Sequence, residues 1–175
     1  MDLQPFFEAE FAIQVHVVAA LFAFFSGLAL FFLMRKGTAR HKRLGKAWVV
    51  AMVIVALSSF FIHELRQWGS FSVVHLISVF VLGLLVYAIV KVRQGDIDAH
   101  RFTMMGLFLG GLVLAGALTF ARGLFMHRIV FPNGSGDFLP SMRELPFSIP
   151  VTVLLMAALA FVLVSLYATF EQRRR

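Results

Sequence analysis

The stretch that decides the fold is FAIQVHVVAALFAFFSGLALFFLM (Phe11–Met34), followed directly by the basic stretch RKGTARHKRLGK (Arg35–Lys46). A helix of about 20 apolar residues crosses the roughly 30 Å hydrocarbon core of a bilayer. A secretory signal peptide has a basic region before a shorter apolar core. Here the preceding segment MDLQPFFEAE is acidic, and the basic cluster comes after the apolar stretch. We therefore expect Phe11–Met34 to be a retained transmembrane helix.

The composition of the whole chain indicates the same solvent. Of its 175 residues, 60% are hydrophobic, 14% are charged and 21 are phenylalanine. A soluble domain of this size could not bury that much apolar surface. The absence of cysteine excludes disulfides, iron–sulfur clusters and thiolate metal sites. The net charge of +7 comes from residues that flank apolar stretches, so we expect contacts with the lipid bilayer and not with nucleic acid.

Four further stretches are long and apolar enough, or nearly so, to span a membrane: Ala47–His63, Ser72–Val90, Phe102–Ala121 and Ile149–Phe170. The sequence thus predicts an all-α, polytopic membrane helix bundle of five transmembrane helices. We expect residues 1–125 to form a four-helix core and residues 126–148 an extracytoplasmic loop. Residues 149–175 would add the fifth helix and a basic cytoplasmic tail.

The distribution of basic residues predicts the orientation. Twelve Lys and Arg residues fall in Arg35–Lys46, Lys91–Thr103 and the C-terminal tail, whereas only four fall in the segments on the other side. Loops rich in Lys and Arg stay in the cytoplasm. We expect a multi-pass protein of the cell inner membrane, with its N-terminus outside and its C-terminus in the cytoplasm.

Four histidines show a regular spacing. His16 and His75 are 59 positions apart, and so are His41 and His100. The first four spans can therefore be described as two similar helical hairpins, related by a two-fold axis along the membrane normal. Such symmetry would bring His16 toward His75 near the outer face and His41 toward His100 near the inner face.

Two facing imidazoles on alternate helices of a bundle can ligate a b-type haem from both sides. We expect two haem b sites, one held by His16 and His75 and the other by His41 and His100. Residues expected to support these sites are Arg40, Lys42, Arg43, Arg101 and Arg122, and glycines expected to leave room for the macrocycle are Gly27, Gly83, Gly110 and Gly111. The alternative is that these histidines are interfacial residues that meet headgroups or backbone carbonyls.

His63, Glu64, Arg66 and Arg122 form a second outer group. His63 together with His16 and His75 could bind copper or zinc through imidazole. The structural alternative is a set of salt-bridged interfacial residues. Phosphate-binding, nucleophile-elbow and zinc-protease motifs are absent, so no hydrolase or transferase is indicated, whereas a role in an oxidoreductase stays open.

Several short motifs resemble a family of bacterial membrane proteins known as domain of unknown function 2306. They are His41-Lys42-Arg43-Leu44-Gly45, Ser58-Ser59-Phe60-Phe61-Ile62, Phe71-Ser72-Val73-Val74-His75-Leu76, Arg93-Gln94-Gly95-Asp96 before His100-Arg101, and Gly110–Gly116. The resemblance covers roughly residues 16 to 131 and implies no established activity. The chain departs from the family where Ala121-Arg122-Gly123 replaces a frequent Pro-Gly-Arg. The histidine layout is similar to that of four-helix dihaem b-type cytochromes.

Three functions follow as hypotheses. The first is a small electron carrier that passes electrons across the membrane, with a quinone or a membrane redox protein as partner. The second is a non-redox accessory or assembly subunit of a larger membrane complex, in a homo- or hetero-oligomer. The third is metal handling through the outer histidines around His63.

Overall fold

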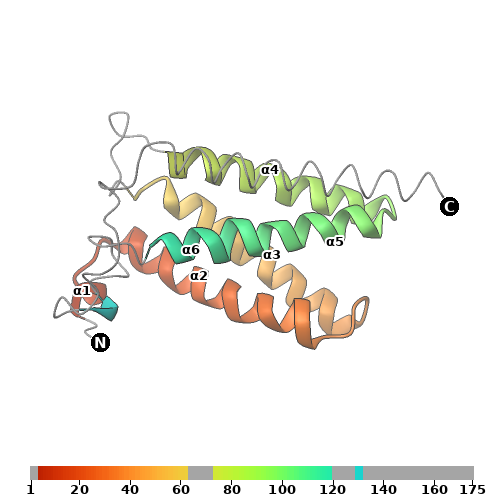
Figure 1. The fold of residues 1–175 in the computed structure, drawn as a ribbon, viewed down its shortest axis with the longest axis horizontal. Helices are drawn as coiled ribbons and strands as arrows, with labels where there is room; N and C mark the ends of the chain where they lie inside the picture. The colour runs from red at the N-terminus through yellow and green to blue at the C-terminus, as the bar shows by residue number, and fades with distance from the viewer. Residues whose placement is uncertain (1–3, 63–72, 120–128, 132–175) are drawn as a thin grey trace.

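The computed structural model describes residues 4–62, 73–119 and 129–131, and every regular element within them is helical. The π-helix η1 continues α2, and η2 and α6 continue α5, so the elements join into four long rods (Figure 1). The bounds are α1 Gln4–Phe7, α2 Phe11–Leu28, η1 Ala29–Leu33, α3 Ala39–Ser59, α4 Val73–Arg93, α5 Ile97–Gly106, η2 Leu107–Leu114 and α6 Ala115–Leu118.

The four rods form a closed ring. The α3 helix packs against α2 and α4, α4 packs against α5 and η2, and η2 returns to α2. Consequently α2 and α4 lie on one diagonal of the bundle, and α3 and α5 lie on the other. The connections Met34–Thr38 and Gln94–Asp96 lie at the same end (Figure 1). We call this the basic end and the other the distal end.

A helical membrane bundle is thus confirmed. Within the described residues, three stretches are long and apolar enough to cross a bilayer, namely Phe11–Leu33, His75–Arg93 and Ile97–Ala117. They correspond to the predicted first, third and fourth spans. The fifth predicted span, Ile149–Phe170, lies outside the described residues, as does almost all of the predicted loop 126–148.

The second predicted span, Ala47–His63, differs from the helix observed. The α3 helix begins at Ala39 and ends at Ser59. It begins earlier because Thr38 is an N-cap whose hydroxyl accepts a hydrogen bond from the His41 backbone N–H at 3.2 Å. The first two turns therefore carry four basic residues, and a shorter apolar part remains to cross the hydrocarbon.

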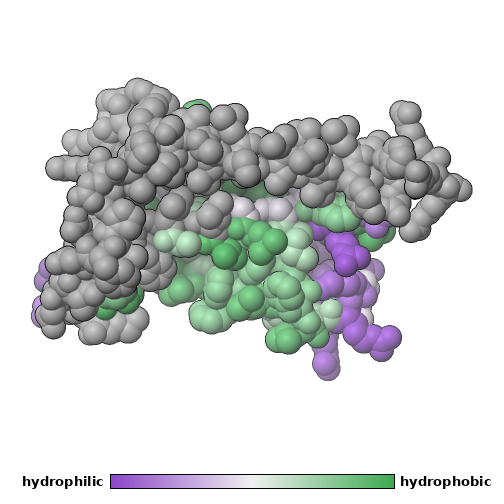
Figure 2. Space-filling view, viewed as in Figure 1, coloured by the Kyte–Doolittle hydropathy of each residue, from purple (hydrophilic) through white to green (hydrophobic). Residues whose placement is uncertain are grey.

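The outer surface of the bundle is apolar. Phe25, Leu33, Val86 and many other large hydrophobic residues are exposed. Figure 2 shows hydrophobic residues along the middle of the visible face and hydrophilic residues at the basic end. Contiguous exposed apolar surface on this scale marks a site of contact with a membrane or another protein, and here it is the surface that lipid chains solvate.

The centre of the bundle is built on a close approach at Gly27. Trp48 and Phe108 are fully buried, and they come from α3 and η2, the two rods that contact α2. A Cβ at Gly27 would lie 2.5 Å from the Phe108 ring and 3.0 Å from Trp48 Nε1. The Trp48 indole N–H donates to the Ala23 carbonyl at 2.9 Å, one turn earlier on α2. Small residues let helices approach this closely in lipid.

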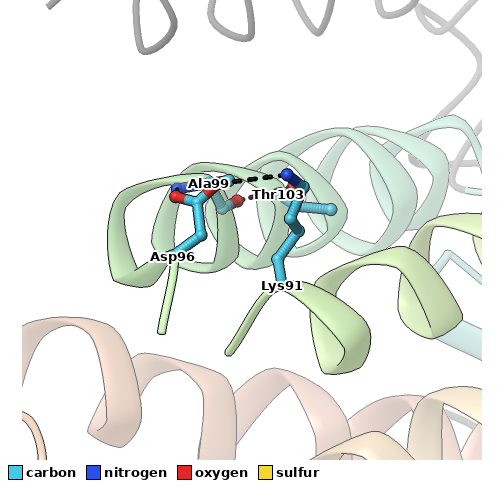
Figure 3. A network of polar contacts seen from close by, with 4 residues as sticks. All are labelled: Lys91, Asp96, Ala99 and Thr103. Atoms are coloured by element: carbon cyan, nitrogen blue, oxygen red, sulfur yellow. Dashed lines mark hydrogen bonds and ion pairs between the residues drawn. The ribbon is translucent and has the colours of Figure 1, made fainter. Parts of the chain in front are cut away.

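The turn at Gln94–Asp96 is determined by local chemistry. Gly95 has φ +83°, and the N–H groups of Gly95 and Asp96 donate to the Val92 and Lys91 carbonyls, which is the Schellman pattern of a helix end. The Asp96 carboxylate then caps α5 by accepting from Ala99 N–H at 3.1 Å, and it pairs with Lys91 at 3.2 Å (Figure 3). The cap starts α5 at Ile97, five residues before the predicted span began.

The packing at Gly27 leads to a stability prediction. Gly27→Ala should lower stability by about 1–3 kcal/mol, because the added methyl would overpack against the buried rings of Trp48 and Phe108. Gly83→Ala is the matched control, since a Cβ there meets nothing within 4 Å, and its effect should stay within about 1 kcal/mol. Thermal unfolding in detergent micelles measures both, and equal midpoints for the two variants would contradict the packing argument.

Candidate functional site

At the distal end, His16 is hydrogen-bonded to the neighbouring helix. Its Nδ1 atom lies 3.0 Å from the Ser58 hydroxyl oxygen of α3. The same hydroxyl lies 2.7 Å from the Ile54 carbonyl on its own helix. His16 is partly buried and Ser58 is buried. This is a contact between polar side chains in the interior of an apolar bundle, where such groups are rare and usually functional.

His75 lies at the same end, on the diagonally opposite helix. It is only 3% exposed, and its ring centroid is 5.8 Å from that of Phe60. The Ser59 hydroxyl is hydrogen-bonded to the Ser78 hydroxyl, so Ser78 lies at the level of Ser59. His75 is three residues from Ser78 on α4, and Ser58, which contacts His16, is one residue from Ser59 on α3. Both offsets have the same direction along the bundle, so His75 and His16 differ in level by about 6 Å.

At the basic end, His100 is anchored to α4. Its Nδ1 atom lies 2.9 Å from the Ala88 carbonyl oxygen. A carbonyl can only accept, so Nδ1 carries the proton and Nε2 keeps its lone pair in the neutral ring. Metal-ligating histidines usually donate their second ring N–H in this way.

His41 lies near His100 on the diagonally opposite helix. Burial lowers the pKa of His41 below the ordinary value for histidine, and the positive charges of Lys36 and His100 lower that pKa further. Its Nδ1 atom is buried, and no described residue is hydrogen-bonded to it. An unsatisfied buried nitrogen is uncommon in a native structure and calls for an explanation such as an absent ligand or water.

The two histidine levels are well separated. The Ala88 carbonyl is hydrogen-bonded to His100, and Ala88 is 13 residues from His75 on the same helix. This separation corresponds to a rise of about 20 Å along the helix axis. Between the levels, the core is filled with aromatic rings, and the centroids of Phe31 and Phe108 are 5.1 Å apart. The bundle therefore holds two polar layers with an apolar layer between them.

Four glycines were expected to leave room for a macrocycle, and not all of them do. The space beside Gly27 is occupied by the side chains of Trp48 and Phe108, and a Cβ at Gly111 would lie 3.3 Å from the Val81 side chain. Gly83 is exposed on the bundle surface, so it lines no interior space. A Cβ at Gly110 meets nothing within 4 Å. Room for a macrocycle would have to come from the histidine levels and not from the middle of the bundle.

The predicted supporting residues Arg40, Lys42, Arg43 and Arg101 are all exposed at the basic end. Sequence reasoning missed Lys36, whose ammonium group donates to the Leu30 and Phe31 carbonyls at 2.6 and 2.8 Å and so caps η1. It also missed Ser58 and Ser59 as site residues. Two adjacent serines within an apolar stretch were the signal that could have identified them.

Two predicted residues, His63 and Arg122, lie outside the described residues. Over the described ranges, no group of three or more His, Cys, Asp or Glu side chains is arranged to hold a metal ion. The metal site around His63 therefore stays a prediction from sequence.

The fold and the buried polar layers define a polytopic helical membrane protein. Residues 13–119 match the family model described as predicted membrane protein (DUF2306). The match covers more than half of the chain, and the protein belongs to this family. No curated protein and no solved structure matches the chain.

The position of His41 predicts a pH dependence. A group whose pKa is lower in the folded state is protonated more readily in the unfolded state, so stability is greatest above the ordinary pKa of 6.5 and is lost as the pH falls. The temperature of the unfolding midpoint should therefore decrease as the pH is lowered from about 8 to about 5.5, and His41→Gln should make that decrease smaller. Arg101→Gln is the control, because arginine does not titrate in this window. Identical pH profiles for the wild type and His41→Gln would contradict the prediction.

Proposed function

We propose that this protein is a b-type haem electron carrier of the membrane, with one haem between His16 and His75 and a second between His41 and His100. The observation that carries the proposal is the placement of these histidines. Each pair lies at one end of the bundle, on two helices that are diagonal to each other. Imidazoles in this arrangement can approach a flat macrocycle from its two faces.

The chemistry of the ring nitrogens supports this proposal. His100 donates from Nδ1 to a carbonyl, which leaves Nε2 available as a ligand. His41 has a buried Nδ1 atom without a hydrogen-bond partner among the described residues. Such a nitrogen costs about 1–3 kcal/mol. Coordination of this nitrogen to a metal would remove that cost, which supports a ligand at this level.

The other residues have definite roles in this proposal. A bound haem would supply reversible one-electron chemistry at its iron. Arg40, Lys42, Arg43 and Arg101 surround the basic end and would neutralise the carboxylates of a haem at that level. A membrane quinone or a redox protein would exchange electrons with the carrier.

The pairing leads to a spectroscopic prediction. Protein purified with haem supplied should show a Soret band, and its reduced form should show b-type α bands from two haems. His16→Ala, His75→Ala and the double variant of these two residues should each lose the same half of the bound haem. His41→Ala and His100→Ala should lose the other half, because a bis-histidine site fails when either ligand is removed. Combining His16→Ala with His41→Ala should remove all of it.

His127→Ala is the matched control, because this histidine belongs to neither pair, and it should retain both haems. A colourless wild-type preparation made with haem supplied would overturn the proposal. In that case, if alanine changes at all four histidines were harmless and a stable partner co-purified, the result would identify an accessory subunit. Equal haem loss in all single variants, including His127→Ala, would contradict the pairing.

The proposal includes an orientation in the inner membrane, with the distal end and the N-terminus outside and the basic end in the cytoplasm. Its support is the excess of Lys and Arg in the two connections of the basic end. Electrons would then pass between an outer haem at His16 and an inner haem at His41.

This orientation can be tested by cysteine labelling, because the chain has no cysteine of its own. Glu8→Cys and Gln94→Cys replace exposed residues at opposite ends of the bundle. In intact cells, an impermeant maleimide should label Glu8→Cys, whereas Gln94→Cys should react only after the membrane is opened. The reverse pattern would place the basic end outside.

A further inference from the structure

The Ser58 hydroxyl makes contacts that set the protonation of His16. Its oxygen lies 2.7 Å from the Ile54 carbonyl and 3.1 Å from the Val55 carbonyl, both on its own helix, and 3.0 Å from His16 Nδ1. A serine has one hydroxyl proton and two acceptor lone pairs. Both carbonyls can only accept, so the proton is directed to them and a lone pair is left for His16.

The consequence concerns the tautomer of the His16 ring. If Ser58 accepts, His16 Nδ1 must carry the proton, and Nε2 keeps the lone pair. This is the same tautomer that the Ala88 carbonyl selects at His100. The two histidines belong to different pairs and are anchored by different chemical groups, yet both are left with Nε2 as the unprotonated nitrogen.

The position of Ser58 on α3 reinforces this effect. Consecutive residues of a helix point about 100° apart, so Ser58 and Ser59 reach the two helices on either side of α3. Ser58 contacts His16 of α2, and Ser59 contacts Ser78 of α4, one turn from His75. The serine pair thereby sets the level of α2 and of α4 against α3, and both distal histidines depend on it.

We infer that Ser58 is a positioning residue, which holds His16 as the Nδ1–H tautomer with Nε2 free to bind an electron-deficient centre. The ligand itself, a haem iron, rests on the proposed function. The fixed tautomer does not, because it is a property of the protein without any cofactor.

The test uses the full-length protein without haem, labelled with 15N in its histidine rings and held in detergent micelles at about pH 8, where histidine is neutral. The His16 signals are identified by their loss in His16→Gln. In the wild type, His16 should show a protonated Nδ1 and an unprotonated Nε2. Ser58→Ala removes the acceptor and should shift the ring toward a mixture that includes the Nε2–H form. Ser58→Thr retains a hydroxyl and should restore the wild-type signals.

Ser26→Ala is the matched control. Ser26 is also a buried serine that donates to carbonyls of its own helix, at Phe22 and Ala23, and its replacement should leave the His16 signals unchanged. The His100 signals report whether each variant has kept its fold. If Ser58→Ala does not fold, the wild-type spectrum still decides, since a proton on Nε2 of His16 would overturn the inference. An unchanged His16 tautomer in a folded Ser58→Ala variant would overturn it as well.

A second readout separates this inference from the proposed function. If haem binds, Ser58→Ala should weaken its binding at the distal pair by about 10–100-fold, and Ser26→Ala should not. Colourless protein with the expected tautomer change would reject the haem carrier and keep Ser58 as the positioning residue. Haem binding with no tautomer change in Ser58→Ala would support the haem carrier and reject Ser58 as the positioning residue.

Discussion

The hydrogen bond from Trp48 to the Ala23 carbonyl, next to Gly27, fixes how α2 and α3 lie against each other. Lipid offers no hydrogen-bond partners, so a buried indole N–H must find its acceptor within the bundle. The absence of a side chain at Gly27 lets Trp48 and Phe108 reach α2 from two sides. Once this contact is made, Ser58 contacts His16 at one end, and the charge of Lys36 acts on His41 at the other.

The interior that results has three layers. Polar side chains gather at the two ends, where water and headgroups are near, and an apolar core of aromatic rings and aliphatic side chains fills the space between them. The hydroxyls of Ser58, Ser59 and Ser78 are all hydrogen-bonded, as buried polar groups must be. The two polar layers are thereby held about 20 Å apart, at opposite ends of the bundle.

The sequence was most informative where one physical effect dominated. The first apolar stretch predicted α2 and η1 to within a residue, because an unbroken run in lipid has no alternative to a helix. The starts of α3 and α5 were wrong by several residues, since the caps at Thr38 and Asp96 begin those helices in the polar sequence that precedes each apolar stretch. The repeat of 59 residues predicted the topology, but the hairpins are not equivalent in detail. The His100 Nδ1 atom is hydrogen-bonded to the Ala88 carbonyl oxygen, whereas His41 Nδ1 has no hydrogen-bond partner among the described residues.

By itself, then, the sequence determined that this is a membrane helix bundle and that its histidines fall at two ends, because apolar length and charge position act locally along the chain. Only the tertiary structure decided which helices are diagonal, that Gly27 holds two rings and not a cofactor, and that Ser58 faces His16. These features depend on the rotation and level of one helix against another, which are set by side-chain packing between residues far apart in the sequence.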